Sequence, residues 1–165
     1  ALELQLPDQT FDAVWSVEAG PHMPDTQRYA DELLRVMRPG GLLAVADWNR
    51  RDPSDGGMTR TERWVMRQLL NQWAHPEFAS IKGFRQNLGN SVHQRGEIVT
   101  GDWTQATLPS WIDSIIEGVR RPWAVLSLGP KAVLQGLRET PTLLLMHWAF
   151  ATGLMQFGVF RIRKG

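Results

Sequence analysis

The sequence contains no cysteine, which excludes a disulfide framework, an iron–sulfur cluster, a thiol nucleophile and cysteine-ligated zinc. An excess of one charge is also missing, because eighteen basic and seventeen acidic side chains leave a formal net charge of +1. The phosphate-binding glycine loop, HExxH, GxSxG and the EF-hand loop are absent as well, so no motif of an NTPase, a zinc protease, a serine hydrolase or a calcium sensor is present. We therefore expect neither a nucleic-acid partner nor a metal site.

What remains is the composition of one ordinary globular domain. The 165 residues, 42% hydrophobic and 21% charged, are enough to build a single hydrophobic core. The chain starts at Ala1 without a charged segment followed by an apolar one, so no signal peptide is indicated and a cytoplasmic protein is expected. Because the first residue is not methionine, we also expect residues 1–165 to be one truncated domain.

Charge and tryptophan are unevenly distributed. Residues 1–58 carry ten acids and five bases, whereas residues 59–165 carry seven acids and thirteen bases. The two parts either face different partners or each other, or they are two solvated surfaces that happen to differ. Eight tryptophans stand against one tyrosine, and such large rings either fill a core or line a site for flat or apolar ligands.

The first part of the chain has the pattern of a strand, a helix and a second strand. A short β-prone run covers residues 11–16, and Asp25 can cap a helix that continues to Arg38. Pro39, Gly40 and Gly41 end that helix. Residues 42–46 are continuously apolar, which is typical of a strand covered on both faces. Together they predict two parallel strands joined by a helical crossover, hence an α/β fold.

The second part predicts helices followed by a last strand. Thr59 and Glu62 form a capping-box pattern before one helix, and Pro109 is expected to start another. A third helix should break at Pro141, where Thr140 can cap a new one. The remaining expected elements are a short helix at 81–88 and strands at 97–103 and 157–163.

Residues 140–160 carry no charge and precede several bases, as in a membrane span. Pro141, His147, Gln156 and two glycines interrupt this segment. A change from helix to strand near Gly153 explains the pattern better.

Three segments carry a resemblance to a known family. They are Leu-Pro-Asp-Gln-Thr-Phe-Asp at 6–12, Glu-Ala-Gly-Pro-His-Met-Pro-Asp at 18–25, and Leu-Leu-Arg-Val-Met-Arg-Pro-Gly-Gly at 33–41. They resemble the C-terminal half of a class I S-adenosylmethionine-dependent methyltransferase. Residues 46–52, 69–76 and 102–104 resemble the tocopherol and plastoquinone branch in particular. Pro21 departs from that branch, where glutamate usually precedes the histidine.

The resemblance implies a Rossmann-like sheet of parallel strands with an antiparallel C-terminal strand and helices on its faces. Residues 11–16 would pair in parallel with 42–47, and 157–163 would lie antiparallel beside the latter. The implied activity is S-adenosylmethionine-dependent C-methylation of a prenylated quinol or phenol, a lipophilic aromatic substrate. Because the glycine-rich loop of the family is absent, the cofactor site would be incomplete in this chain.

The same resemblance nominates site residues. Ala1 and Leu2 would border the adenine of the cofactor, and Ser16, Val17 and Glu18 its methionine part, at the carboxyl ends of the strands where open α/β sheets bind ligands.

Candidates for removing a phenolic proton are His22, Glu18 and Asp47, in that order, since histidine titrates near neutral pH. Each also has a purely structural interpretation: a loop histidine, a helix cap and a turn former. Six tryptophans could wall a channel for a prenyl tail, although about half of them are expected to be core: Trp48, Trp73, Trp103, Trp111, Trp123 and Trp148.

Two other functions remain open at this point: methylation of another small molecule, and a non-catalytic interaction fragment. Peripheral contact with a membrane is open as well. The strand at 11–16 should lack a neighbour on one side, so its open edge predicts self-association.

Overall fold

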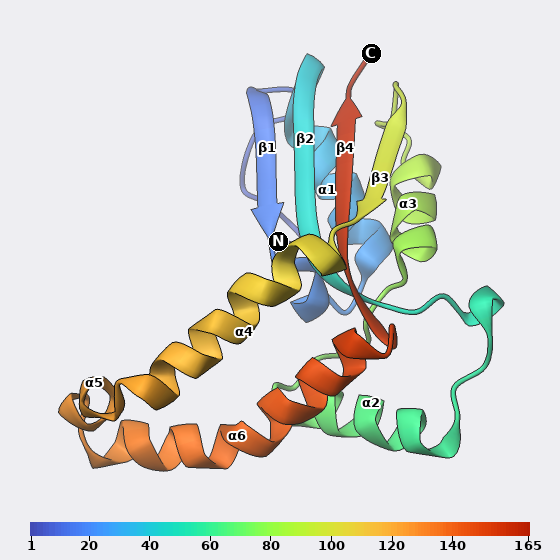
Figure 1. Cartoon of the computed structure of the whole chain (residues 1–165). Coiled ribbons are helices and arrows are strands. Elements are labelled where there is room, and N and C mark those ends of the chain that lie inside the picture. Colours follow the sequence, from blue (N-terminus) through green and yellow to red (C-terminus); the bar gives the residue numbers. More distant parts are fainter.

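The computed structural model describes residues 1–165, apart from the side chains of residues 119, 124 and 125. A four-stranded mixed sheet forms its centre, with the strand order β1-β2-β4-β3. Two helices cover one face of this sheet, and the other helices lie beyond the lower end of the sheet as drawn in Figure 1. The strands are β1 (Phe11–Val17), β2 (Met37–Arg50), β3 (Ile98–Asp102) and β4 (Met155–Arg163). The α-helices are α1 (Thr26–Val36), α2 (Arg60–Gln72), α3 (Ile81–Asn90), α4 (Thr104–Arg120), α5 (Pro122–Ser127) and α6 (Pro130–Ala151).

The predicted strand–helix–strand crossover is confirmed. The carboxylate of Asp25 caps α1 by accepting a hydrogen bond from the backbone N–H of Arg28. β1 and β2 pair in parallel, with Val14 opposite Leu43 and Trp15 opposite Ala44. The expectation that the helix continues to Arg38 and ends at Pro39–Gly41 is wrong: α1 ends at Val36, and residues 39–41 lie within β2, where the register with β1 shifts between Phe11 and Ala13.

The C-terminal end of α1 is closed by a residue from the other end of the chain. The ammonium group of Lys164 donates hydrogen bonds to the carbonyl oxygens of Leu34 and Met37, at 2.8 and 2.7 Å. These carbonyls belong to the unsatisfied groups at a helix end, so the cation supplies the donors they need. The side chain is buried, and burial lowers the pKa of Lys164.

The expectation that residues 42–46 are covered on both faces is wrong. Leu43 and Val45 are buried beneath α1 and α3, whereas Leu42 and Ala44 are exposed on the opposite face. Trp15 of the neighbouring strand is 80% exposed on the sheet as well. The pattern is continuous in hydrophobicity, yet only alternate residues lie in the core of this chain.

The antiparallel half of the sheet agrees with the prediction. β4 pairs with β2 on one side, with Val45 opposite Phe160, and with β3 on the other, with Thr100 opposite Phe160. The sheet face beneath α1 and α3 forms the first core, which includes Tyr29, Leu34 and Phe160.

Two helix boundaries expected at prolines are wrong. α4 begins at Thr104, five residues before Pro109, because the carboxylate of Asp102 accepts hydrogen bonds from the backbone N–H and the hydroxyl of Thr104. α6 continues through Pro141 without a break. The hydroxyl of Thr140 donates to the carbonyl of Gly136 within the helix instead of capping a new one.

A second core joins α2 and the C-terminal part of α6. It contains Leu69, Phe78, Met146 and Met155, all almost completely buried. The predicted capping box of α2 is present in both directions between Thr59 and Glu62. Trp64 of the same helix is 52% exposed.

The uncharged segment 140–160 changes from α6 to β4, as the interrupted pattern predicts. Within the part of the chain that the structure describes, no helix has the length and apolar character needed to cross a membrane.

Candidate functional site

The carboxyl ends of β1 and β2 lie side by side and bring the predicted residues 16–18 and 47–48 together. Glu18 follows β1 directly, and its backbone N–H donates to the carbonyl of Ala46 across 2.8 Å. Its φ of 54° lies in the left-handed region that residues other than glycine seldom adopt. Such strained positions often occur at functional sites, where surrounding contacts hold them in place. One of these contacts is with Trp48, whose indole N–H donates to Oε1 of Glu18 at 3.1 Å.

Asp47 lies beneath this corner and is only 3% exposed. Its Oδ1 accepts a hydrogen bond from the backbone N–H of Gly20 at 3.2 Å. A Cβ atom on Gly20 would collide with the same carboxylate, so the close approach requires glycine at this position. Burial raises the pKa of Asp47 to about 7, although the backbone donors at Gly20 and Ala19 oppose that rise.

Ser16 faces α1 instead of the open cleft. Its hydroxyl forms a 2.6 Å hydrogen bond with the hydroxyl of Tyr29. Tyr29 is buried, and this burial, together with the negative charge of Asp47, raises its pKa to about 12. The pair therefore fixes the end of β1 on helix α1 with neutral groups.

His22 stands in a short 3-10 helix (Gly20–His22) that follows β1. Its ring packs against that of His75, with the ring centroids 4.4 Å apart. His75 is buried, and its Nδ1 lies 3.1 Å from the carbonyl oxygen of Pro21. Burial lowers the pKa of His75, and the neighbouring His22 lowers it further.

The residue that sequence reasoning missed is His75. Trp48, Trp73 and Phe78 also surround its ring, with centroid distances of 6.1, 6.2 and 5.0 Å. The only local signal was the run of Trp73, Ala74 and His75 before Pro76, which identifies no partner. The contact with Pro21 spans 54 residues of sequence, so the pairing depends on the fold.

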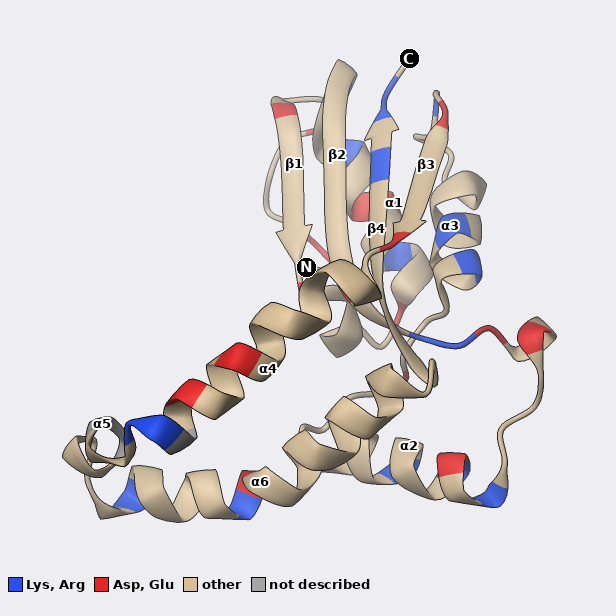
Figure 2. Cartoon of the chain, in the orientation of Figure 1, with Lys and Arg blue, Asp and Glu red and all other residues tan. Residues whose placement is uncertain are grey.

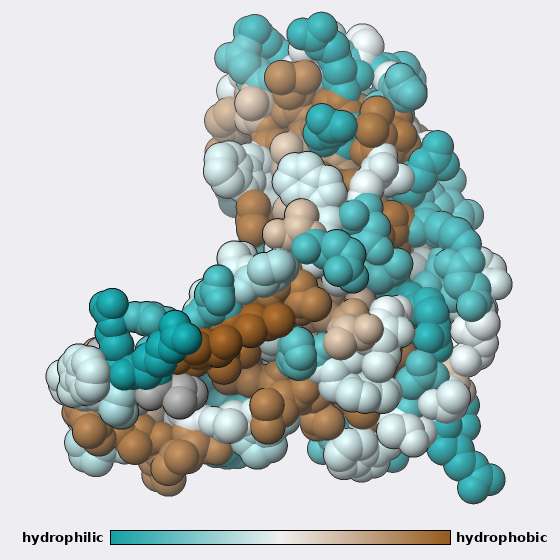
Figure 3. Space-filling model, viewed as in Figure 1, coloured by the Kyte–Doolittle hydropathy of each residue, from teal (hydrophilic) through white to brown (hydrophobic). Residues whose placement is uncertain are grey.

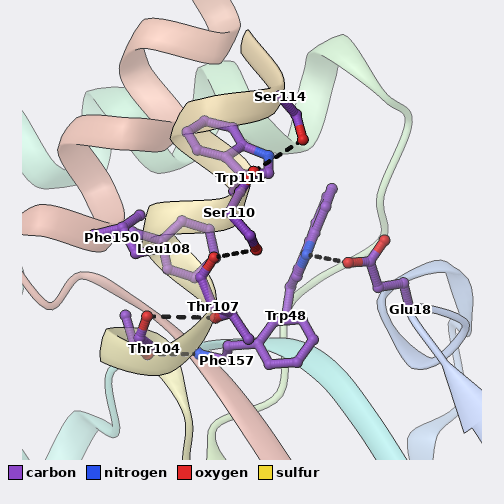
Figure 4. Close-up of a pocket in the computed structure, with 10 residues that line it drawn as sticks. All are labelled: Glu18, Trp48, Thr104, Thr107, Leu108, Ser110, Trp111, Ser114, Phe150 and Phe157. Carbon is purple, nitrogen blue, oxygen red and sulfur yellow. Dashed lines mark hydrogen bonds between the residues drawn. The ribbon is translucent and has the colours of Figure 1, made fainter. Parts of the chain in front are cut away.

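Beside this cluster lies a cavity of about 310 Å³. Figure 4 shows its residues: Glu18 and Trp48 lie on one side, and the first three turns of α4 lie on the other. The lining consists of Glu18, Trp48, Thr104, Thr107, Leu108, Ser110, Trp111, Ser114, Phe150 and Phe157. The wall is thus largely apolar, with one carboxylate and a row of hydroxyls.

The hydroxyls on α4 donate to the backbone of that helix. Thr107 donates to the carbonyl of Trp103, Ser110 to that of Thr107, and Ser114 to that of Ser110. Their oxygens therefore offer lone pairs as acceptors. The indole N–H of Trp48, a donor on the opposite wall, is engaged by Glu18. Among the described lining residues there is no lysine, arginine or histidine, so the cavity offers hydroxyl and carboxylate acceptors, the indole N–H of Trp111 as a donor, and no cation.

The predicted cofactor residues fall in four environments. Ala1 and Ser16 both border a second hollow of about 320 Å³ between the N-terminal segment, β1 and α1. Leu2 packs against the first core, and Val17 is 49% exposed. Glu18 lines the first cavity.

The six predicted tryptophans are not gathered in one channel. Trp48 and Trp111 line the cavity, and Trp73 lies 6.0 Å from Trp48 between ring centroids. The other three are outside this lining and exposed to different degrees: Trp103 at 52%, Trp123 at 65% and Trp148 at 37%. Among the residues that the structure describes, no cluster of metal-binding side chains is found.

Known proteins that are similar to this chain include several methyltransferases. The family model of a methyltransferase domain matches residues 1–45. The chain is 52% identical to 2-methyl-6-phytyl-1,4-hydroquinone methyltransferase of Synechocystis, over 99% of this chain and 52% of that protein. It is 28% identical to the chloroplastic tocopherol O-methyltransferase of Arabidopsis thaliana, over 99% of this chain and 47% of that protein.

Solved structures share the fold at low sequence identity. Phosphoethanolamine N-methyltransferase 2 of Haemonchus contortus superposes with a TM-score of 0.81 at 13% identity, covering 99% of this chain and 35% of that one. Geranyl diphosphate C-methyltransferase of Streptomyces coelicolor gives 0.68 at 16% identity, covering 99% and 50%. The architecture is that of class I methyltransferases.

Sequence and fold together make the chain similar to methyltransferases: residues 1–45 match the methyltransferase-domain model, and 99% of the chain aligns with 2-methyl-6-phytyl-1,4-hydroquinone and tocopherol methyltransferases. The chain spans about half the length of these curated relatives.

Proposed function

We propose that this segment forms the substrate-binding half of an enzyme that C-methylates a prenylated quinol or phenol with S-adenosylmethionine. The observation that carries the proposal is the acceptor-lined, cation-free cavity beside Glu18, in a chain 52% identical to a phytyl-hydroquinone methyltransferase. A quinol is a flat ring whose hydroxyls donate hydrogen bonds. Its ring complements the tryptophan and phenylalanine walls, and its hydroxyls complement the serine, threonine and glutamate oxygens.

The same lining disfavours anionic substrates. A phosphate group needs lysine, arginine or several free backbone donors, and this cavity presents a carboxylate in their place. The fold is shared with a methyltransferase of geranyl diphosphate, but a fold does not fix the substrate. The residues that line the cavity therefore favour a neutral hydroxylated ring.

The residues present fit only one edge of the cofactor. The hollow beside Ala1 and Ser16 is bordered mainly by apolar residues. The sequence has no glycine-rich loop that could hold the cofactor. S-adenosylmethionine would supply an electrophilic methyl group when bound. In this segment, Ser16, Val17 and Glu18 would border the methionine part of the cofactor. The backbone of Ala1 and Leu2 would border its adenine.

Carbon methylation of a phenol requires removal of a hydroxyl proton, which raises the electron density at the ring carbons. Glu18 is placed to accept a hydrogen bond from a ring hydroxyl in the cavity. His22, in the next turn and packed against His75, is the candidate base, but it lies outside the cavity lining, so it would act on a hydroxyl that reaches beyond this lining. The carboxyl of Asp47 lies buried below them and holds the turn through Gly20. The tryptophan walls would align the ring and exclude water.

A second substrate class is favoured by one relative. The chain is 28% identical over 99% of its length to norajmaline N-methyltransferase of Rauvolfia serpentina, which suggests an amine acceptor as the alternative. An amine nucleophile would use the same aromatic walls, and Glu18 would then stabilise its positive charge.

The two possibilities are separated by one assay. The segment replaces the matching half of the Synechocystis relative, and the chimera receives labelled S-adenosylmethionine with either 2-methyl-6-phytyl-1,4-hydroquinone or norajmaline. We expect label in the quinol alone. Label in norajmaline alone would reject the quinol assignment, and the unmodified relative serves as the positive control.

A further inference from the structure

Helices α4, α5 and α6 form an arm that projects away from the sheet (Figure 1). α4 and α6 run beside each other, and α5 joins them at the far end. Along the outer side of α6 the apolar residues recur at alternating intervals of three and four, which places them on one face. We call them the α6 stripe: Leu134, Leu137, Pro141, Leu144 and Trp148. The three leucines are 70%, 68% and 63% exposed.

The far end of the arm is apolar as well. Trp123, Leu126 and Leu128 are 65%, 62% and 73% exposed there. In the space-filling view, hydrophobic side chains gather along the arm (Figure 3). Isolated exposed leucines are ordinary on a protein surface, but a continuous set of this kind marks a contact surface.

Basic residues outnumber acidic ones in this part of the arm. Residues 117–139 contain four bases, Arg120, Arg121, Lys131 and Arg138, and two acids, Glu117 and Glu139. Figure 2 shows blue segments at the end of the arm, with red segments on the neighbouring parts of α4 and α6. Glu139 accepts a hydrogen bond from the side chain of Gln135. Arg121 pairs with Glu117. Among the residues that the structure describes, the other three have no acidic partner. Arg138 adjoins the α6 stripe, four residues after Leu134.

We propose that the α6 stripe and the end of the arm dock on a lipid surface with anionic headgroups. Exposed tryptophan and leucine flanked by unpaired lysine and arginine are the combination that holds a helix in the plane of such an interface. No described helix is long and apolar enough to cross the bilayer, so the arm lies on the surface. Leucine and tryptophan enter the headgroup region while the bases face the anionic headgroups.

A second copy of the chain fits this surface less well. A two-fold contact places the same patch of both copies together, which would bring the unpaired bases of one arm against those of the other. The surface is also a projecting ridge instead of a groove. A fluid lipid layer adapts to a ridge, whereas a protein partner must supply a matching cleft.

The inference is independent of the proposed reaction, because it concerns residues outside the cavity lining. It places the cavity near lipid all the same, since α4 lines the cavity with its first turns and reaches the end of the arm with its last.

The test is co-sedimentation of the 165-residue chain with vesicles of phosphatidylcholine alone or mixed with phosphatidylglycerol. We expect binding to the mixed vesicles, weakened by salt. The double variant Leu134→Glu/Leu137→Glu should lose at least about tenfold in affinity. Val92→Glu, which changes a 75% exposed apolar residue away from the arm, should bind like the parent chain. Circular dichroism and thermal melting establish that each variant is folded.

The charge contribution is tested separately. Lys131→Glu/Arg138→Glu should weaken binding to the mixed vesicles about tenfold or more, whereas Arg85→Glu/Arg161→Glu, the same charge change away from the arm, should alter it far less. Failure of the parent chain to bind, or equal binding by the Leu134→Glu/Leu137→Glu variant, would overturn the proposal. A dimer in sedimentation velocity that this variant abolishes, without vesicle binding, would assign the stripe to a second copy and overturn it too.

Discussion

The rings of His22 and His75 lie 4.4 Å apart between centroids, and the buried member of the pair is the one that holds the loop. Nδ1 of His75 is 3.1 Å from the carbonyl of Pro21. In the tautomer that carries its proton on Nδ1, this N–H donates a hydrogen bond to the carbonyl of Pro21 and orients the ring. The residue proposed to move a proton is thus supported by a residue that resists protonation.

His75 should make stability depend on pH. Its pKa is lowered in the folded chain from the ordinary 6.5. As the pH falls below about 6.5, the unfolded chain therefore takes up a proton that the folded chain resists, and stability falls. We expect the free energy of unfolding to decline as the pH is lowered through this range. His75→Asn keeps an N–H donor for Pro21 and should flatten this decline. Urea unfolding at several pH values measures it, and an unchanged slope in the variant would contradict the assignment.

Asp47 should act in the opposite direction. Its folded pKa, about 7, exceeds the ordinary 3.8, so its contribution to stability is present at low pH and is lost as the pH rises toward 7. Asp47→Asn keeps an oxygen acceptor for the N–H of Gly20 and removes the buried charge. At about pH 8 this variant should be more stable by about 2 to 4 kcal/mol, at about 1.4 kcal/mol per pKa unit.

The Asp47→Asn background also isolates the contribution of His75, since the opposing carboxyl is then absent. A variant that is no more stable than the parent at about pH 8 would mean that Asp47 is already neutral or solvated there.

His22→Ala should affect the chemical step in a complete enzyme that contains this segment. We expect turnover to fall about 10²- to 10⁴-fold with little change in cofactor affinity, because a general base acts in the transition state. His22→Gln, which retains a polar side chain beside His75, is the matched control and should be equally slow. Turnover within about twofold of the parent would leave His22 with a structural role alone.

S-adenosylmethionine should bind the isolated 165-residue chain weakly. The sequence has no glycine-rich loop, and the hollow beside Ala1 and Ser16 offers chiefly backbone and apolar side chains. Isothermal titration calorimetry of the chain, with the intact Synechocystis relative as the positive control, measures the difference. A micromolar dissociation constant, about −8 kcal/mol, would show that these residues form a more complete site than proposed.

The order of the sheet could be predicted because its signals are local or supported by the resemblance. Asp25 caps the start of α1, and residues 39–41 lie between the end of α1 and the apolar residues of β2. Short local patterns therefore indicate both boundaries to within a few residues. The prolines at 109 and 141 misled the prediction for the opposite reason. Asp102 and Phe157 both contact Thr104, and this tertiary anchor starts α4 before its proline.

The candidate site was predictable only in part. Glu18 follows the end of β1, Asp47 and Trp48 lie among the last residues of β2, and the carboxyl ends of parallel strands meet at one edge of the sheet. The strain at Glu18 and the neighbour of His22 could not be read from the sequence, because the φ of 54° and the contact with His75 both depend on packing. The tryptophans were predicted by residue type alone, which does not say which face of a helix meets the cavity.

The open edge of β1 should make the chain self-associate. β1 is terminal in the strand order and pairs with β2 alone, so the N–H and C=O groups along its other side face no strand and can recruit one.

A charge on this strand is the means to test that association. Val14 packs against the first core and would not tolerate a charge, but Trp15 is 80% exposed. Trp15→Lys should therefore reduce association without unfolding the chain. Val99→Lys, on the opposite edge strand β3 and 40% exposed, should leave association unchanged. Sedimentation velocity over a range of concentrations decides between these outcomes. A parent chain that stays monomeric at high concentration would show that the edge of β1 does not recruit a partner, because the energy of pairing there does not exceed the entropy of association.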